Sequence, residues 1–180
     1  MALRKIRLQE EEILHKHAKE IREITQRIRD LAADMLETMY DAEGVGLAAP
    51  QVGILKRIVV IDISEERDSP IVMVNPVITE REGEQTGWEG CLSVPGKSGM
   101  VTRPMNVKAE FTSLDGEAMT IEAEGFLARA ICHELDHLDG HLYVEKVEGR
   151  LYDNSELRNA SEDDEDEDEI SDGNDGRTKS

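Results

Sequence analysis

Two histidines four residues apart, with a glutamate directly after the first, stand near the end of the sequence. They are His133, Glu134 and His137, in the run HELDH. Four residues along a helix rise about 6 Å and turn about 400°, so both imidazoles would project from one face and reach one divalent ion. Glu134 lies about 100° around the helix, where a carboxylate takes a proton from water on the metal. A chance match is expected on the order of once in a hundred chains of this size.

A catalytic metal site needs a third protein ligand, and the sequence offers one upstream. Downstream, the sequence has only His141, just past Gly140 where the helix should end, and an acidic run. Cys91, in the strand-like segment GWEGCLSVPG, would complete a Cys-His-His set. A lone cysteine is more often a small buried hydrophobe. We expect that packing role for Cys132, which is about 100° around the helix from His133.

The stretch EGVGLAAPQVG, residues 43–53, is a further candidate. Gly44 and Gly46 permit close backbone approach, and the alanines and proline that follow add little bulk. Gln51 is the one polar side chain in the middle, and its amide is able to donate to a developing oxyanion. Taken alone, such a loop is by default a plain helix-to-strand connection. It lacks the spacing of a phosphate-binding loop, so no nucleotide is implied.

Two amphipathic helices and several strands must position these residues. Apolar residues at helical spacing predict one helix over residues 25–43, capped by Thr25, and another over residues 125–140, with a possible shorter helix within residues 10–21. Strand-like segments follow the first helix: residues 57–62, 71–78, 106–114 and 118–124. Asp115-Gly116 predicts a tight hairpin between the last two. The order predicts an α+β fold with antiparallel β-strands packed around a C-terminal metal-binding helix and an N-terminal amphipathic helix.

The charge of the chain divides it into two parts. The 180 residues carry a net charge of −19, and residues 153–180 hold twelve acidic and three basic residues. Such blocks repel themselves and stay solvated. We therefore expect a catalytic domain in residues 1–152 and a disordered acidic tail in residues 153–180, with a solubilising role favoured over an interaction role. So acidic a chain is a poor candidate for nucleic-acid binding.

The sequence also bears on location. It has no run of eighteen apolar residues, and its start, MALRKIRLQEEEIL, does not resemble a secretory signal. We therefore expect a cytoplasmic protein without a membrane span. In a reduced compartment, the two cysteines favour thiol chemistry or packing over a disulfide.

Three stretches together resemble the signature segments of the peptide deformylase family. GVGLAAPQ at residues 44–51, EGCLS at residues 89–93 and HELDH at residues 133–137 occur in the family's order and with family-like intervals. The resemblance runs from near Met1 to about Tyr152, and the glycine of EGCLS resembles the bacterial type I branch. It implies an amide hydrolase that removes the formyl group from the N-terminal formyl-methionine of polypeptides emerging from the ribosome.

The resemblance also implies a role for each site residue. The implied metal ligands are Cys91, His133 and His137. Glu134 would be the general base and then the acid as metal-bound water attacks the formyl carbon, and the oxyanion would meet the metal, the Gln51 side chain and the backbone N–H of Leu92. The family is associated with Fe²⁺, which is favoured here, with Zn²⁺, Ni²⁺ or Co²⁺ as substitutes.

The substrate is expected to lie extended against the backbone of Val45 and Gly46 on one side and of Gly90 on the other. Phe126 and Ala130 share the helix face of His133. They are expected either to wall the methionine side-chain pocket or to pack in the helix core.

Glu89 and Arg103 match the family's buried ion pair that supports the site. A solvated pair would contribute little to stability. Burial therefore decides whether this pair matters.

Two other functions stay open at this point. A zincin-type protease shares the helix motif, but no third ligand follows His137 at a usable distance. A non-catalytic binding module would keep the fold and use the tail for a partner. Against it, all six proposed ligand and catalytic groups are present.

Overall fold

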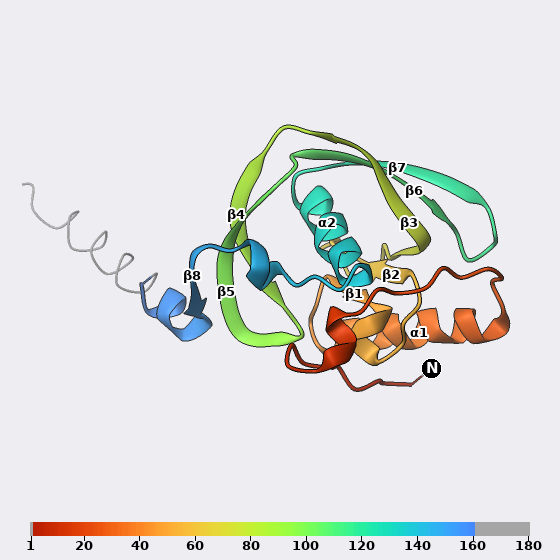
Figure 1. Cartoon of the computed structure of the whole chain (residues 1–180), viewed down its shortest axis with the longest axis horizontal. Coiled ribbons are helices and arrows are strands. Elements are labelled where there is room, and N and C mark those ends of the chain that lie inside the picture. The colour runs from red at the N-terminus through yellow and green to blue at the C-terminus, as the bar shows by residue number, and fades with distance from the viewer. Residues whose placement is uncertain (1, 161–180) are drawn as a thin grey trace, which may run out of the picture.

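Two antiparallel sheets and two main helices make up the fold of residues 2–160, the part that the computed structural model describes (Figure 1). A five-stranded sheet has the order β1-β2-β3-β6-β7, and a three-stranded sheet has the order β4-β5-β8. The strands are β1 (Gly46–Ala48), β2 (Ile58–Ile61), β3 (Ile71–Glu82), β4 (Gln85–Cys91), β5 (Val94–Arg103), β6 (Asn106–Thr112), β7 (Ala118–Glu124) and β8 (Glu148–Asp153). All pairings between these strands are antiparallel, which confirms the predicted α+β fold class.

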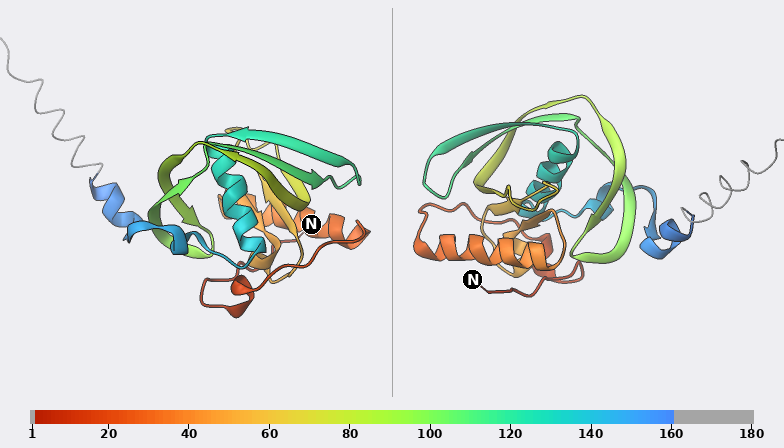
Figure 2. Two further views of the ribbon diagram at one scale, coloured as in Figure 1. Left: turned by 45° about the horizontal axis from the view of Figure 1, so that its top comes forward. Right: turned by 180° about the vertical axis from the view of Figure 1, so that it is seen from behind.

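The N-terminal amphipathic helix is α1, Gln26–Asp41. As predicted, Thr25 caps it, since its side chain accepts a hydrogen bond from the Ile28 N–H. The apolar face packs in a core shared with β1 and β2, through residues such as Leu31 and Met35. In the view from behind, at the right of Figure 2, α1 lies on the opposite side of the molecule from β4 and β5.

The shorter helix expected within residues 10–21 forms only one 3-10 turn, Glu12–His15. The chain beyond this turn makes its backbone hydrogen bonds elsewhere. The N–H of Ala18 donates to the carbonyl of Leu138. The N–H of Lys19 donates to the carbonyl of Leu55, and the carbonyl of Lys19 accepts from the N–H of Arg57. Tertiary pairing therefore replaces the helical pattern that the sequence favoured.

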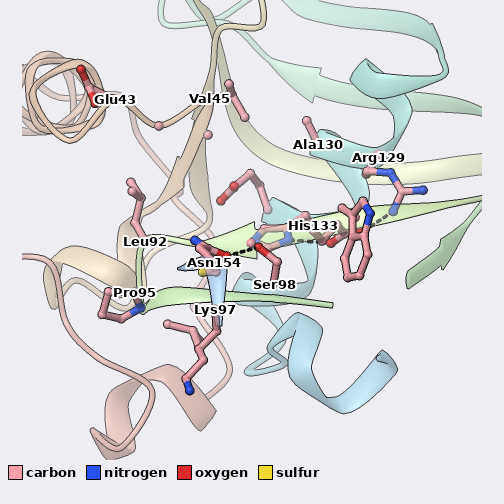
Figure 3. A pocket seen from close by; sticks show the side chains of 18 of the residues that line it. Glu43, Val45, Leu92, Pro95, Lys97, Ser98, Arg129, Ala130, His133 and Asn154 are labelled. Carbon is pink, nitrogen blue, oxygen red and sulfur yellow. Dashed lines mark hydrogen bonds and ion pairs between the residues drawn. The ribbon is translucent and has the colours of Figure 1, made fainter. Parts of the chain in front are cut away.

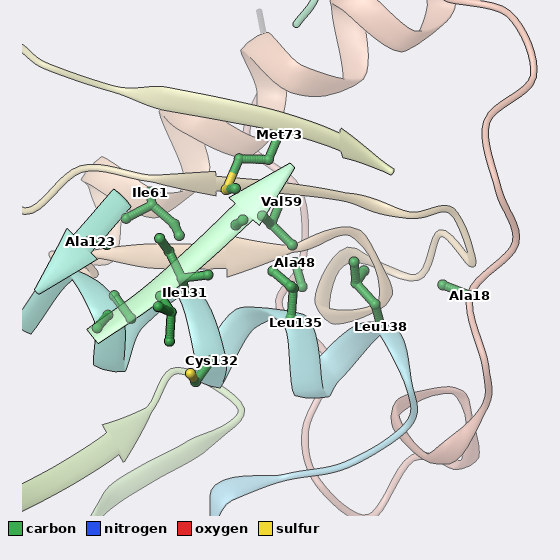
Figure 4. Close-up of a cluster of buried hydrophobic side chains, with 14 residues drawn as sticks. Ala18, Ala48, Val59, Ile61, Met73, Ala123, Ile131, Cys132, Leu135 and Leu138 are labelled. Carbon is green, nitrogen blue, oxygen red and sulfur yellow. The ribbon is translucent and has the colours of Figure 1, made fainter. Parts of the chain in front are cut away.

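The C-terminal helix is α2, Phe126–Leu138. Gly125 before it and Gly140 after it both have positive φ, 63° and 79°, which favours glycine. One face of α2, including Ile131 and Leu135, packs against the five-stranded sheet (Figure 4). Cys132 belongs to the same buried cluster, and burial raises the pKa of its thiol. The packing role predicted for Cys132 is the one it has.

The last described residues of the chain continue the three-stranded sheet and then turn helical. Asp153 ends β8, where it pairs with Lys97 of β5, and residues 154–160 are helical. Of the predicted tail, only Asp153 belongs to the ladder with β5, and the division of the chain near residue 152 stays a prediction. The rest of the expected tail, residues 161–180, lies outside the described residues.

Within the described part, neither α1 nor α2 nor any other helix is long and apolar enough to cross a membrane.

Candidate active site

A cleft of about 470 Å³ opens between β4, α2 and the segment around β1 (Figure 3). This volume is typical of small-ligand sites. The cleft brings together residues from all three sequence stretches that carry chemistry: Gly46, Gln51, Cys91, His133 and Glu134.

Cys91, His133 and His137 form a metal site. Cys91 ends β4, while the two histidines lie one turn apart on α2. Their ligand atoms lie within 4.8 Å of one another, and Cys91 Sγ is 3.4 Å from His137 Nε2. Sulfur and nitrogen bound tetrahedrally to one ion, at about 2.3 and 2.0–2.1 Å, would be about 3.5 Å apart. The thiol and imidazole are therefore spaced as ligands of a single ion.

The surroundings of the histidines also fit a cation. His133 Nδ1 is 2.8 Å from Glu89 Oε1, a pairing that puts the proton on Nδ1 and leaves Nε2 for a metal. Burial alone would lower the pKa of His133, but hydrogen bonds to Cys91 and Glu89 raise it to about 10. The protein thus favours positive charge here. Burial lowers the pKa of His137 well below its ordinary value, so its ring is neutral, the form that binds metals.

Glu134 lies in the cleft beside these ligands. It is 5% exposed, and its Oε2 makes no hydrogen bond to the described residues. Burial raises the pKa of Glu134 to about 7, against the opposing charge of His133. Gly46 comes so close that a Cβ there would lie 2.8 Å from Glu134 Cδ. An unsatisfied buried carboxylate is costly, and such groups are typical of catalytic sites.

Gln51 is held with its amide nitrogen toward the metal ligands. The backbone N–H of Ala48 donates to Gln51 Oε1 at 2.9 Å, which fixes Nε2 on the other side. Nε2 lies 3.5 Å from Cys91 Sγ and 3.1 Å from Ser93 Oγ. Leu92, which follows Cys91, also lines the cleft. Sequence reasoning did not single out Ser93, although it lies within the EGCLS segment.

Glu89 and Arg103 form an ion pair that is almost completely buried, at 6% and 4% exposure. Two guanidinium nitrogens of Arg103 each donate to Glu89 at 2.9 Å. Burial would raise the pKa of Glu89, but the bonds from Arg103 and His133 outweigh it and hold that pKa well below its ordinary value. Arg103 also donates to Asp136 at 2.6 Å, so the pair is tied to α2.

Arg129 is a buried residue of the site that sequence reasoning missed. Its Nη1 donates to Glu89 Oε2 at 2.6 Å and to the carbonyl of Val101 at 3.0 Å. Arg129 lies four residues before His133 and so shares its helix face. That spacing is the signal that would have pointed to it.

The expected substrate-binding residues all line the cleft: Val45, Gly46, Gly90, Phe126 and Ala130. Phe126 is 53% exposed, so it is not part of the helix core. Ala130 is buried at 6% exposure. Gly46 of β1 and Gly90 of β4 line the cleft from two different strands; Gly46 is buried, and Gly90 is exposed.

A Cys-His-His metal site with a buried carboxylate beside it, in a cleft between antiparallel sheets and a helix, defines a metal-dependent hydrolase. Comparison with known proteins narrows this class. The pattern of the polypeptide deformylase family matches residues 3–151, and the chain belongs to that family.

Relatives and solved structures agree with this assignment. The chain is 65% identical to the peptide deformylase of Agathobacter rectalis over 153 residues, which cover 85% of this chain and 95% of that protein. A crystal structure of the Legionella pneumophila peptide deformylase matches with 43% identity and a TM-score of 0.79, covering 82% of this chain and 87% of that one. The Synechococcus elongatus enzyme in complex with actinonin matches with 40% identity and a TM-score of 0.77, covering 81% and 79%.

Proposed function

We propose that the protein hydrolyses the formamide bond of N-terminal formyl-methionine in polypeptides emerging from the ribosome, releasing formate. The observation that carries this proposal is the Glu134 Oε2 atom beside the three metal ligands, which has no hydrogen-bond partner among residues 2–160, in a cleft lined by Gly46 of β1 and Gly90 of β4. We place the reaction in the cytoplasm. The net charge of −19 argues against direct contact with nucleic acid.

Each part of the site has a task in this reaction. Cys91, His133 and His137 would hold a divalent ion, which supplies Lewis acidity and lowers the pKa of water. Glu134 accepts the proton of the attacking water and then delivers it to the leaving amine nitrogen. Gln51 Nε2 and the backbone N–H of Leu92 donate to the oxyanion that develops on the formyl oxygen.

The cleft orients the peptide. The backbone at Val45 and Gly46 and the edge at Gly90 would bind an extended substrate on its two sides. Phe126 and Ala130 would form the wall against the methionine side chain. Recognition of the backbone allows many sequences to follow the methionine.

We favour Fe²⁺ as the active ion, on the family's association with iron, and expect Zn²⁺, Ni²⁺ or Co²⁺ to replace it. The Cys-His-His set alone does not select iron, because nitrogen and sulfur ligands bind zinc more tightly. Both Fe²⁺ and a thiolate are oxidisable. The metal must therefore be identified in protein prepared without oxygen.

The test is formate release from formyl-methionyl peptides by anaerobically purified protein, with metal analysis of the same sample. We expect one divalent ion per chain and one formate released for each peptide that is deformylated. Bound metal without formate release would contradict the proposal and favour a binding module, while cleavage of internal peptide bonds would favour a zincin-type protease.

Gln51→Ala should lower kcat by about 10²–10³-fold, the usual cost of one oxyanion donor. The expected loss of stability is smaller, about 2 kcal/mol for the two bonds with the Ala48 N–H and Ser93 Oγ. Kinetics and thermal unfolding of the variant measure the two effects. Ser93→Ala is the control, since it removes a partner of Gln51 and keeps the donor. Normal turnover with early melting of Gln51→Ala would show a structural role only.

Gly46→Ala should lower kcat about 10²-fold, because the new methyl group would displace the Glu134 carboxylate. Metal content should stay unchanged. Gly44→Ala is the matched control, since its Cβ would meet the end of the Leu92 side chain, 2.7 Å away, and not Glu134. Equal losses in kcat for the two variants would show that Gly46 matters for the backbone of this segment rather than for Glu134.

A further inference from the structure

One wall of the cleft is built by a residue beyond position 151, where the match to the family ends. Asn154 lines the cleft together with Ser98 of β5, and the two lie side by side in Figure 3. The Ser98 hydroxyl donates to Asn154 Oδ1 at 2.6 Å. The segment after β8 therefore contributes to the site and is not merely attached to the domain.

Several contacts fix Asn154 at this position. In the ladder between β5 and β8, Lys97 is opposite Asp153, and their side chains form an ion pair at 2.5 Å. The ring of Tyr152 meets Trp88 of β4 edge-on, with ring centroids 5.5 Å apart. The segment that carries Asn154 is thus anchored to both other strands of its sheet.

The Ser98–Asn154 pair lies beside Gly90, whose backbone is proposed to bind the substrate, and all three residues line the cleft. A Cβ placed on Gly90 would be 3.6 Å from Ser98 Oγ. An extended peptide rises about 3.3 Å per residue, so a chain bound along Gly90 passes this pair within a residue or two of the methionine.

The pair offers donors to that chain. Since Asn154 Oδ1 accepts from Ser98, the amide nitrogen of Asn154 keeps two N–H groups, and no hydrogen bond from it is found among residues 2–160. The main-chain carbonyls of an extended peptide are able to accept hydrogen bonds from these N–H groups. Every polypeptide has such carbonyls at the same spacing, whatever its sequence.

We propose that Ser98 and Asn154 form a subsite for the peptide backbone beyond the formyl-methionine, with Asn154 Nδ2 donating to a main-chain carbonyl. The subsite makes the enzyme prefer longer peptides without selecting their sequence. This inference rests on the proposed function of the same cleft.

The first test compares kcat and KM for formyl-methionine amide and for formyl-Met-Ala-Ala amide. The native chain should have a higher kcat/KM for the longer peptide, and one neutral hydrogen bond from Asn154 should account for about 2–10-fold of that gain. Asn154→Ala should lower the gain by this factor, through KM, and keep its turnover of formyl-methionine amide within about twofold. Asn154→Asp keeps the acceptor for Ser98 and removes the donor, so it should lower the gain in the same way. Asn159→Ala, an exposed asparagine in the same helical segment, should behave as the native chain.

A binding measurement separates this inference from the proposed function. Trp88 is the only tryptophan of the sequence, lines the cleft and is 49% exposed, so its fluorescence should report peptide binding in a Glu134→Gln chain that does not turn over. The longer peptide should bind more tightly than formyl-methionine amide, and Asn154→Ala should reduce the difference in affinity by about 2–10-fold. Length-dependent binding without formate release by the native chain would support the subsite and contradict the enzymatic proposal. Formate release with the same length dependence in Asn154→Ala, or equal losses on both peptides, would overturn the subsite.

Discussion

Replacing Glu134 by glutamine should lower kcat for formate release by about 10²–10⁴-fold while the metal stays bound. Glutamine has the same size as glutamate, but its amide does not accept a proton from water at neutral pH. Glu134 Oε2 makes no hydrogen bond within the described part of the chain, so little native structure depends on its charge. Because a buried carboxylate without a partner is costly, the variant should melt at the same temperature or higher.

Three measurements on Glu134→Gln decide its role: formate release, metal content and thermal unfolding. Glu145→Gln is the matched control, since Glu145 is an exposed glutamate outside the cleft that pairs with His141. Its activity should equal that of the native chain. Undiminished turnover in Glu134→Gln would place the base elsewhere, and loss of metal would show that Glu134 helps to bind the ion.

The helices and the two histidine ligands could be predicted from the sequence because their signals are local. Thr25 and the apolar period mark α1, and a spacing of four places His133 and His137 on one helix face. Nothing local connects Cys91 with these histidines, which are more than forty residues away. The missing third ligand pointed to that cysteine, and the resemblance to a family strengthened the choice.

The strands β5 and β8 were missed because their own composition does not favour strands. They are strands because they form hydrogen bonds with neighbouring strands of the sheet. The β5 sequence VPGKSGMVTR contains a proline and two glycines, residues that are depleted in strands. Gly99 is required there, since a Cβ would come within 2.6 Å of Val147. β5 is paired on both edges, with β4 and β8, so long-range hydrogen bonding overrides weak propensity.

Arg129 was missed for a related reason. A single arginine in a helix usually faces solvent. Here it is 6% exposed because Glu89, forty residues earlier on β4, supplies the counter-charge. A buried charge is tolerated only with such a partner, and the sequence does not show which partner is near.

Glu89→Gln should cost about 3–5 kcal/mol of stability, because it removes the charge that two buried guanidinium groups share. Both Arg103 and Arg129 donate to Glu89, and a glutamine would turn a donor toward one of them. At about 2–4 °C per kcal/mol for a domain of this size, the melting temperature should fall by roughly 10 °C. Thermal unfolding of the metal-free protein measures this effect directly.

The same variant should also weaken metal binding by about 10–100-fold, since Glu89 orients His133 through Nδ1. Competition with a chelator under anaerobic conditions measures the affinity. Asp136→Asn is the matched control: Asp136 pairs with Arg103 and makes no hydrogen bond to His133 among residues 2–160, so its loss should lower stability and leave the affinity near the native value. If Asp136→Asn weakened metal binding as much as Glu89→Gln does, the affinity would depend on the stability of the whole ionic cluster. A loss of affinity confined to Glu89→Gln would instead show that the Glu89 carboxylate has two separate roles. It neutralises the buried guanidinium groups, and it orients the metal ligand His133.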